Sequence, residues 1–260
     1  MNIKQHLQSQ KGFTLIELAV VLVIVGILLG SFIGTLTSRI DITKKSDTKE
    51  ELEDIKQSMI AYAFVNGYLP CPDCDAAGGD CVAGDVGDGV ADYDAGSSRC
   101  SKNEAAGNVP WVTLGLGRGD PWGNHYRYAV QNEYADTNIP FTLDRLAGGP
   151  AGTASIKEPD YASDATGATW HSLADNVVAI IFSHGKNGYG GISEENVARA
   201  AIPAANIDEL ENTDGDGDFY MRPETLPGAA IAGGEFDDIL NWISEYELKA
   251  KMVEAGKLPP

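Results

Sequence analysis

One stretch near the N-terminus constrains the fold more than any other part of the chain. Residues 13–36 read FTLIELAVVLVIVGILLGSFIGTL, and Glu17 is their single ionisable side chain. As a helix this stretch would reach about 36 Å, enough to cross a hydrocarbon core of roughly 30 Å. Lys and Arg flank it on both sides, so the positive-inside rule alone orients it weakly. The sequence predicts a membrane-spanning helix over residues 13–36.

Three simpler interpretations of this stretch are a secretory signal peptide, a buried core helix and a plain single-pass anchor. A secretory signal peptide has a short apolar region that ends at a small-residue cleavage site, whereas this run is long and continues into a polar helical stretch. A buried core helix would need apolar surroundings that the rest of the chain does not supply. A plain single-pass anchor stays open on composition alone.

The residues at the start of the stretch form a specific pattern. The segment KGFTLIELAVVLVIVGIL, from Lys11 to Leu28, closely resembles the type IV pilin and pseudopilin signature: a basic leader ending in Gly, then Phe, then Glu four residues further on. The resemblance implies cleavage after Gly12 by a prepilin peptidase, leaving Phe13 as the new N-terminus, usually N-methylated. It also implies residence in the inner membrane with the head in the periplasm, followed by assembly into a helical filament of a Gram-negative envelope.

Glu17 has a physical meaning that does not depend on the resemblance. A carboxylate near the start of a membrane helix is costly unless it is paired. No Lys or Arg lies within the apolar run, so a partner has to come from another chain or from the amine that cleavage exposes. The resemblance implies that Glu17 of an incoming subunit neutralises the Phe13 amine of its neighbour, a pair that sets register more than it adds stability. A carboxylate that snorkels to the interface is the alternative.

Helical spacing continues beyond the apolar stretch and defines the domains. From Leu52 to Phe64 the apolar residues recur on one helical face, and Asn66 with Gly67 is typical of a helix end. We expect a leader (1–12), the transmembrane half of a long helix (13–36), its periplasmic half (37–66) and a globular head (67–260). The fold class expected is α+β, a pilin-like fold in which the long helix packs on an antiparallel sheet.

All four cysteines lie within residues 69–100, a loop rich in Gly and Asp. Outside the inner membrane the compartment would be oxidising, so disulfides are expected. Of the three pairings, Cys71–Cys100 with Cys74–Cys81 nested inside it is favoured. A redox-active Cys71–Cys74 pair would need a thioredoxin-like context that is absent. A four-cysteine zinc site would need two paired CxxC knuckles, which the spacing does not provide.

Three motifs in the head resemble the head of the major pseudopilins of type II secretion. DPWGN, residues 120–124, is a turn before an aromatic strand, and NVVAIIFS, residues 176–183, has the β-branched run of a buried strand. FDDILNW, residues 236–242, is expected to be a last strand, followed by a short helix whose capping box starts at Ser244.

The resemblance also implies a metal site, since in that family the acidic loop before the last strand binds calcium. Asp237 and Asp238 match the paired aspartates of the family, while Asn187 stands where the family has Asp. This chain departs from the pattern by a long insertion between the turn and the paired aspartates. Calcium at these residues is therefore an expectation of the resemblance.

The insertion contains a second acidic loop, NTDGDGDFYMRPE. Asn212, Asp214 and Asp216 occupy positions one, three and five of an EF-hand-type loop, with Asp218 beyond them. Position twelve is a proline and Glu224 comes one residue late, so the motif is incomplete. Clustered carboxylates repel one another when unliganded, which suits a hard cation such as calcium. A solvated Asp-Gly turn is the alternative, and which acidic loop holds calcium stays open.

Charge and motif content exclude some function classes. The chain has 19 basic and 38 acidic residues, a formal charge of −19, whereas a nucleic-acid surface needs clustered Lys and Arg. The sequence has no GxSxG, HExxH, P-loop or GxGxxG motif and its histidines are isolated, so no enzyme is indicated.

Three functions agree with these observations. The first two are a pseudopilin of type II secretion and a minor pilin of a surface pilus, whose partners would be other pilin-like subunits, the prepilin peptidase and the inner membrane. The third is a membrane-anchored periplasmic binding protein or enzyme that does not polymerise.

Overall fold

The structure is a computed structural model. It describes residues 13–75, 81, 84–94, 96, 99–100, 107–138, 154–163, 169–225, 227–228 and 232–258, with the backbone alone for 29–38. The expected leader, Gly12 included, lies outside the described residues. The chain divides into two compact units, the first ending at Lys44 and the second beginning at Lys45.

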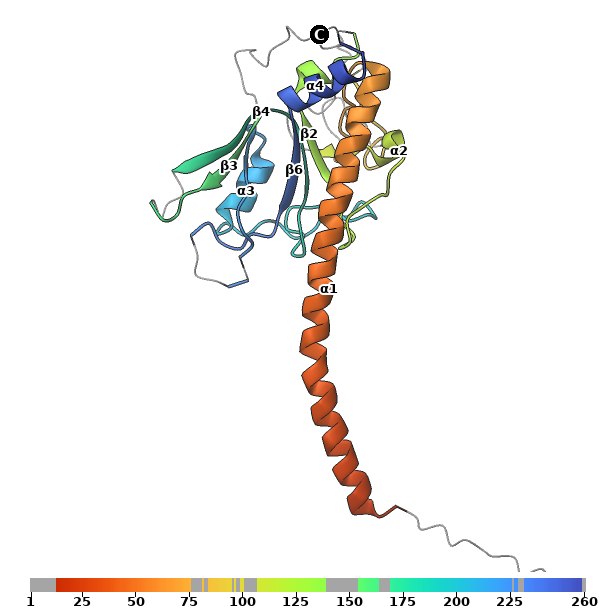
Figure 1. The fold of residues 1–260 in the computed structure, drawn as a ribbon, viewed down its shortest axis with the longest axis vertical. Coiled ribbons are helices and arrows are strands. Elements are labelled where there is room, and N and C mark those ends of the chain that lie inside the picture. The colour runs from red at the N-terminus through yellow and green to blue at the C-terminus, as the bar shows by residue number, and fades with distance from the viewer. Residues whose placement is uncertain are drawn as a thin grey trace, which may run out of the picture. The chain divides into compact units, whose positions relative to one another are not determined.

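The second unit is a mixed α+β head, as expected. Its described residues form the C-terminal part of the long helix, three shorter helices, one 3-10 turn and a six-stranded sheet (Figure 1). The elements in chain order are α1 (Leu15–Asn66), β1 (Gly107–Asn108), α2 (Trp111–Leu114), β2 (Arg127–Val130), η1 (Asn132–Tyr134), β3 (Ala154–Pro159), β4 (Trp170–Ser183), α3 (Ile207–Asp214), β5 (Asp218–Tyr220), β6 (Ile239–Ser244) and α4 (Glu245–Glu254).

Helix α1 begins with a capping box that the sequence interpretation did not identify. The Thr14 backbone N–H and hydroxyl both donate to Glu17 Oε2, at 2.9 and 2.8 Å, and the Glu17 N–H donates back to Thr14 Oγ1 at 3.3 Å. This reciprocal pair satisfies backbone groups that a helix start leaves open. The helix ends where expected, since Gly67 has a φ of 81° and its N–H donates to the Ala63 carbonyl.

The membrane-spanning expectation for residues 13–36 is not established by the structure. Across the described residues, we find no helix with both the length and the apolar character that crossing a membrane requires. The transmembrane half of α1 therefore stays a prediction from the sequence.

The sheet is built around β4 and is mostly antiparallel. The strand order is β1-β2-β4-β3-β5, and β6 also pairs with β4. Only the β3–β5 pair among these is parallel. Asn176 has a φ of 54° between Ala174 and Val177, where the β3–β4 pairing shifts register. The expected strand at 176–183 thus forms the second half of a longer strand, which is buried from Val177 onward, while its exposed first half pairs with β3.

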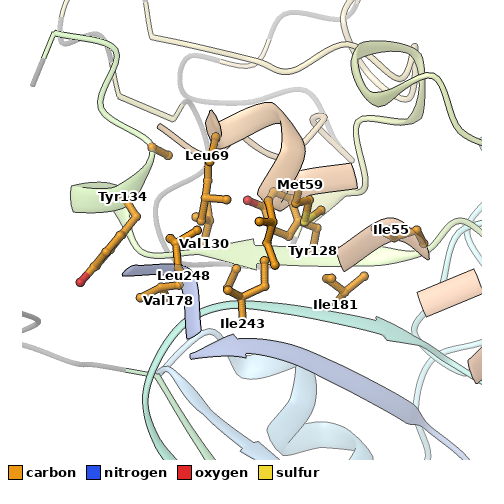
Figure 2. Close-up of a cluster of buried hydrophobic side chains, with 14 of the residues drawn as sticks. Ile55, Met59, Leu69, Tyr128, Val130, Tyr134, Val178, Ile181, Ile243 and Leu248 are labelled. Carbon is orange, nitrogen blue, oxygen red and sulfur yellow. The ribbon is translucent and has the colours of Figure 1, made fainter. Parts of the chain in front are cut away.

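One core cluster lies between α1 and the sheet. Leu52, Ile55 and Met59 of α1 are each at most 4% exposed, which confirms the apolar face predicted for this part of the helix. Figure 2 shows Ile55 and Met59 beside Tyr128 and Ile181 of the sheet. Full burial of an apolar side chain contributes roughly 1.5–3 kcal/mol, so this face provides much of the attachment of the helix to the head.

A second core cluster lies on the opposite face of the same strands. Side chains alternate across a strand, and Ala129 and Ile180 accordingly face away from their neighbours Tyr128 and Ile181. Phe236, which immediately precedes the paired aspartates, is fully buried in this second cluster. This burial positions the start of β6.

The C-terminal elements agree with the sequence. The last strand begins slightly later than expected, at Ile239, and α4 follows it directly. The Ser244 hydroxyl caps α4 by accepting from the Glu247 N–H at 3.2 Å, as the predicted capping box requires.

Two disulfides close the loop that follows α1. The structure pairs Cys71 with Cys100 and Cys74 with Cys81, which is the pairing that the sequence favoured. Cys71, Cys74 and Cys100 are at most 3% exposed. The outer bridge joins residues 29 apart in sequence, and both of its cysteines belong to the core cluster between α1 and the sheet.

Asp73 lies inside this stapled loop and is fully buried. Its Oδ1 accepts from the Gly87 N–H at 3.1 Å, while its Oδ2 has no hydrogen-bond partner among the described residues. Burial, aided by the nearby charges of Asp92 and Asp88, raises the pKa of Asp73 to about 7. The folded protein therefore holds a proton on this carboxyl more tightly than the unfolded chain does.

This difference makes stability depend on pH. An acid whose pKa is about 3.9 when unfolded and about 7 when folded costs stability increasingly as pH rises from about 4 to about 7. We expect the unfolding midpoint of the full chain, measured in detergent with a chelator, to fall over this range. Asp73→Asn should flatten the slope, whereas Asp54→Asn, an exposed control on α1, should leave it unchanged. An identical slope in Asp73→Asn would contradict the assignment.

Candidate functional site

Three buried carboxylates converge where the inserted segment meets the start of β6. Glu209 of α3 and the paired Asp237 and Asp238 each place one oxygen within 4.8 Å of the others. None of the three is more than 9% exposed. The sequence predicted Asp237 and Asp238 but missed Glu209, because its proximity depends on how the insertion folds.

Local backbone geometry makes this convergence possible. Gly185, two residues beyond the end of β4, has a φ of 59°, and a Cβ there would lie 2.3 Å from the Asp237 carbonyl oxygen. Only glycine accommodates both the left-handed backbone and this close approach. The turn after β4 can therefore pack directly against the paired aspartates.

Hydrogen bonds hold Glu209 in place. Its Oε1 accepts from Asn187 Nδ2 at 2.8 Å and from the Asp237 N–H at 3.2 Å, and its Oε2 accepts from Asn206 Nδ2 at 3.0 Å. The Asn187 N–H also donates to Asp237 Oδ2 at 2.9 Å. Asn187 thus reaches the cluster as predicted, although its amide nitrogen, not its oxygen, faces a carboxylate.

Asn212 also joins this cluster, although the sequence placed it in the separate EF-hand-type loop. Its Nδ2 donates to Asp238 Oδ2 at 2.8 Å, and its Oδ1 accepts from the Tyr220 N–H at 2.7 Å. Asn212 therefore connects α3 to both β5 and the paired aspartates.

Several polar atoms at this site have no hydrogen-bond partner among the described residues. They are Asp237 Oδ1, Asp238 Oδ1 and both ring nitrogens of His184. His184 is fully buried, and its Nδ1 lies 3.6 Å from Asp238 Oδ1. Leaving buried polar atoms unpaired costs about 1–3 kcal/mol each, so the arrangement favours a ligand that supplies the missing interactions.

The electrostatics of the three carboxylates also favour a bound ligand. Burial, reinforced by the charge of Asp238, raises the pKa of Glu209 to about 7. Burial and the charge of Asp238 likewise raise the pKa of Asp237 to about 7. Without a counter-charge, neighbouring buried carboxylates resist ionisation together. A divalent cation bound by their oxygens would stabilise the ionised forms.

The EF-hand-type loop forms a second, more open group. Glu211, Asp216 and Asp218 place one oxygen each within 4.8 Å of the others, and Asp216 is exposed. Asp218 forms an ion pair with Lys157 and accepts from the Ser155 hydroxyl at 2.6 Å. The Lys157 ammonium group therefore already neutralises part of the negative charge of this group.

Other predicted ligands of this loop are used in turns or lie elsewhere. Asp214 Oδ1 accepts from the Asp216 N–H at 3.0 Å, and Asp216 Oδ1 accepts from the Asp218 N–H at 2.8 Å. Glu224 forms an ion pair with Lys45 of α1 and is not part of either carboxylate group. The structure therefore does not assemble the predicted set into one EF-hand-type site.

The DPWGN motif, residues 120–124, forms a turn that the Asp120 side chain fastens by hydrogen bonds, and we call it the tied turn. Asp120 Oδ1 accepts from the N–H groups of Trp122 and Asn124, both at 2.9 Å. Asp120 Oδ2 accepts from the Ser183 hydroxyl at 2.6 Å. The turn is thereby joined to the end of β4, directly before His184.

Comparison with known proteins identifies the N-terminal element. A family model described as the prokaryotic N-terminal methylation motif matches residues 7–33. No curated protein and no solved structure matches the chain. The match includes the predicted cleavage point, Phe13 and Glu17, so the chain carries the type IV pilin and pseudopilin signature. A pilin-type precursor, processed by prepilin peptidase and assembled with other pilin subunits, is the class that this signature indicates.

Proposed function

We propose that the chain is a structural subunit, either a minor pilin or a pseudopilin, of an envelope filament. The observation that carries this proposal is the methylation-motif match over residues 7–33, with a lone carboxylate at Glu17 inside an apolar helix. The α+β head, in which the C-terminal part of α1 packs on a mostly antiparallel sheet, is compatible with this role. A membrane-anchored protein that never polymerises is the alternative.

The mechanism that we propose is mechanical. Cleavage after Gly12 exposes the Phe13 amine, and the first part of α1 stays in the inner membrane until it enters the filament. Glu17 of an incoming subunit then neutralises the Phe13 amine of a neighbour. The Thr14 hydrogen bonds occupy Glu17 Oε2, and they orient the carboxylate at the first turn of the helix.

Two filament types remain as finer proposals. A type II secretion pseudopilin is supported by the tied DPWGN turn at residues 120–124 and by the paired aspartates before β6. A minor surface pilin is supported by the large disulfide-stapled head. For either type, we propose that the head binds calcium through carboxylate oxygens.

Processing at Gly12 tests the proposal. In cells with prepilin peptidase, we expect the N-terminal peptide of the membrane-bound chain to begin at Phe13. In cells that lack the peptidase, or in a Gly12→Val variant, the chain should keep its leader and migrate as the larger precursor. Ser9→Val, a leader substitution away from the cleavage point, should be processed normally. Cleavage at another position, or processing without the peptidase, would contradict the proposal.

A further inference from the structure

We propose that the first part of β4 pairs with the same segment of a second copy of this chain, so that two heads form a two-fold symmetric dimer by strand pairing. The segment comprises residues 170–175, and we call it the open edge. The partner is a second copy because the open edge is complementary to itself. This contact is separate from the Glu17 contact proposed for filament assembly.

Strand β4 has a partner on both sides along only part of its length. At Val177 it pairs with Ala154 of β3 on one side and with Ser244 of β6 on the other. The open edge keeps β3 as a partner, whereas β6 ends at Ser244 and the chain continues as α4. Figure 1 shows β3 and the first part of β4 projecting from one side of the head. Because an antiparallel strand directs its N–H and C=O groups alternately to either side, about half of those in the open edge have no strand partner among the described residues.

The open edge also exposes large apolar side chains. Trp170 and Leu173 are each 45% exposed, and the two residues between them are exposed as well. Tryptophan is enriched among the residues that dominate protein interfaces. The segment reads WHSLAD and has no Lys or Pro, which protect many natural edge strands against pairing with another chain. Its composition therefore favours pairing.

The other edges of the sheet are covered or blocked. On β1, Asn108 exchanges two backbone hydrogen bonds with Asp73, at 2.8 and 3.0 Å. On β5, the Tyr220 N–H donates to Asn212 Oδ1 at 2.7 Å, and on β6 the Trp242 N–H donates to the side chain of the preceding residue at 2.8 Å. Within the described part of the chain, the open edge has no comparable local protection.

The open edge is complementary to itself in the antiparallel direction. When two copies pair with Leu173 opposite Leu173, His171 of each copy lies opposite Asp175 of the other. These three residues share one face of the strand, so the pair has an apolar contact at its centre and a basic side chain opposite an acidic one on either side. Shifting the pairing by two residues would place His171 or Asp175 opposite Leu173 instead. The charge pattern therefore selects one register.

Contacts inside each copy leave His171 and Asp175 able to meet a partner. His171 is 70% exposed, and its Nε2 lies 3.4 Å from Asp160 Oδ2, while the other ring nitrogen has no partner among the described residues. Asp175 Oδ1 accepts from the Ser172 hydroxyl at 2.7 Å, which leaves Oδ2 for an imidazole N–H. Each copy thus offers one donor and one acceptor to the other.

The symmetry of the contact limits the assembly to two chains. An isologous contact uses the same surface on both copies and closes on itself, so we expect a dimer and no larger species. Five paired residues per copy span about 17 Å, which is a small interface, so the dimer is weak and depends on concentration. Subunits that follow one another in a filament make head-to-tail contacts, so the open edge would join two chains that are not successive subunits of one filament.

Cysteine cross-linking tests the register. The full chain carrying Leu173→Cys is oxidised in detergent micelles, and non-reducing gels with peptide mass spectrometry detect a bridge between the introduced cysteines. We expect a covalent dimer, because these positions face each other within disulfide reach. His171→Cys alone and Asp175→Cys alone should not cross-link, since equal positions would lie about 13 Å apart along the strands. A mixture of these two variants should cross-link.

Sedimentation equilibrium of the full chain in density-matched micelles measures the strength of the dimer. We expect Leu173→Asp to weaken it at least about tenfold, because two carboxylates would face each other at the centre of the pair. Leu210→Asp makes the same change at a leucine on α3 that is 37% exposed, and it should dimerise as the unmodified chain does. Near-ultraviolet circular dichroism checks that each variant is folded.

Three results would overturn the assignment. An unmodified chain that stays monomeric at every concentration would remove the dimer. Equal dimerisation of Leu173→Asp and the unmodified chain would place the contact elsewhere, for example on the apolar stretch of α1. Cross-linking of His171→Cys alone would contradict the register. The filament proposal does not depend on these outcomes, since processing at Gly12 tests it separately.

Discussion

Replacing Glu17 with alanine is expected to remove this subunit from sheared filaments while the processed chain still accumulates in the membrane. The substitution deletes the carboxylate and leaves the Phe13 amine of a neighbouring subunit without its partner. Breaking a buried charge pair by removing one member costs about 3–5 kcal/mol, which corresponds to a loss of incorporation on the order of 100-fold or more. Immunoblots of the sheared and membrane fractions measure both quantities.

The matched control for this experiment lies on the same helix. Glu50→Ala makes the same change at an exposed position of α1 within the head, and it should leave incorporation unchanged. Glu17→Ala also removes the two hydrogen bonds that Thr14 donates to the carboxylate, whereas the N–H of residue 17 can still donate to Thr14 Oγ1. Replacing the N-cap residue Thr14 itself by alanine costs about 0.5–2 kcal/mol. A Thr14→Ala variant that assembles well would show that the loss in Glu17→Ala does not come from the cap. Normal incorporation of Glu17→Ala would contradict the proposed mechanism.

Removing the outer disulfide by the double change Cys71→Ser and Cys100→Ser is expected to destabilise the head by about 3–4 kcal/mol. The bridge closes a loop between residues 29 apart, so its loss gives the unfolded chain much more conformational freedom. Denaturant unfolding of the full chain in detergent, followed by tryptophan fluorescence, measures the change.

The inner bridge serves as the control for the outer one. Cys74 and Cys81 are only seven residues apart, and the entropic effect of a disulfide grows with loop length. The change Cys74→Ser with Cys81→Ser should therefore cost less stability than the outer pair. Equal effects would show that strain or packing, rather than loop closure, determines the contribution of these bridges.

Several elements of the fold could be predicted from the sequence because their signals are local. The helix end at Gly67, the apolar face around Ile55 and the capping box at Ser244 all follow from residues close together in the chain. The favoured disulfide pairing, with Cys74–Cys81 nested inside Cys71–Cys100, is the one the structure contains.

The candidate site could be predicted only in part because it joins distant segments. Asp237 and Asp238 form a recognisable sequence pair, but Glu209 reaches them only because α3 packs beside the turn after β4. Asn212 fits an EF-hand-type loop by spacing, yet its amide bonds to Asp238. Glu224 fits the same loop by proximity in sequence, yet it pairs with Lys45. Spacing within a loop does not determine which side chains meet after the loop has folded.

The proposed assembly of this chain is tested most directly by immunogold labelling of sheared filaments with an antibody against the head. We predict gold particles on filaments from cells that have prepilin peptidase, and none on filaments from cells that make only Glu17→Ala. Labelling confined to membranes in cells that process the chain normally would contradict the account and favour a membrane-anchored protein that never polymerises.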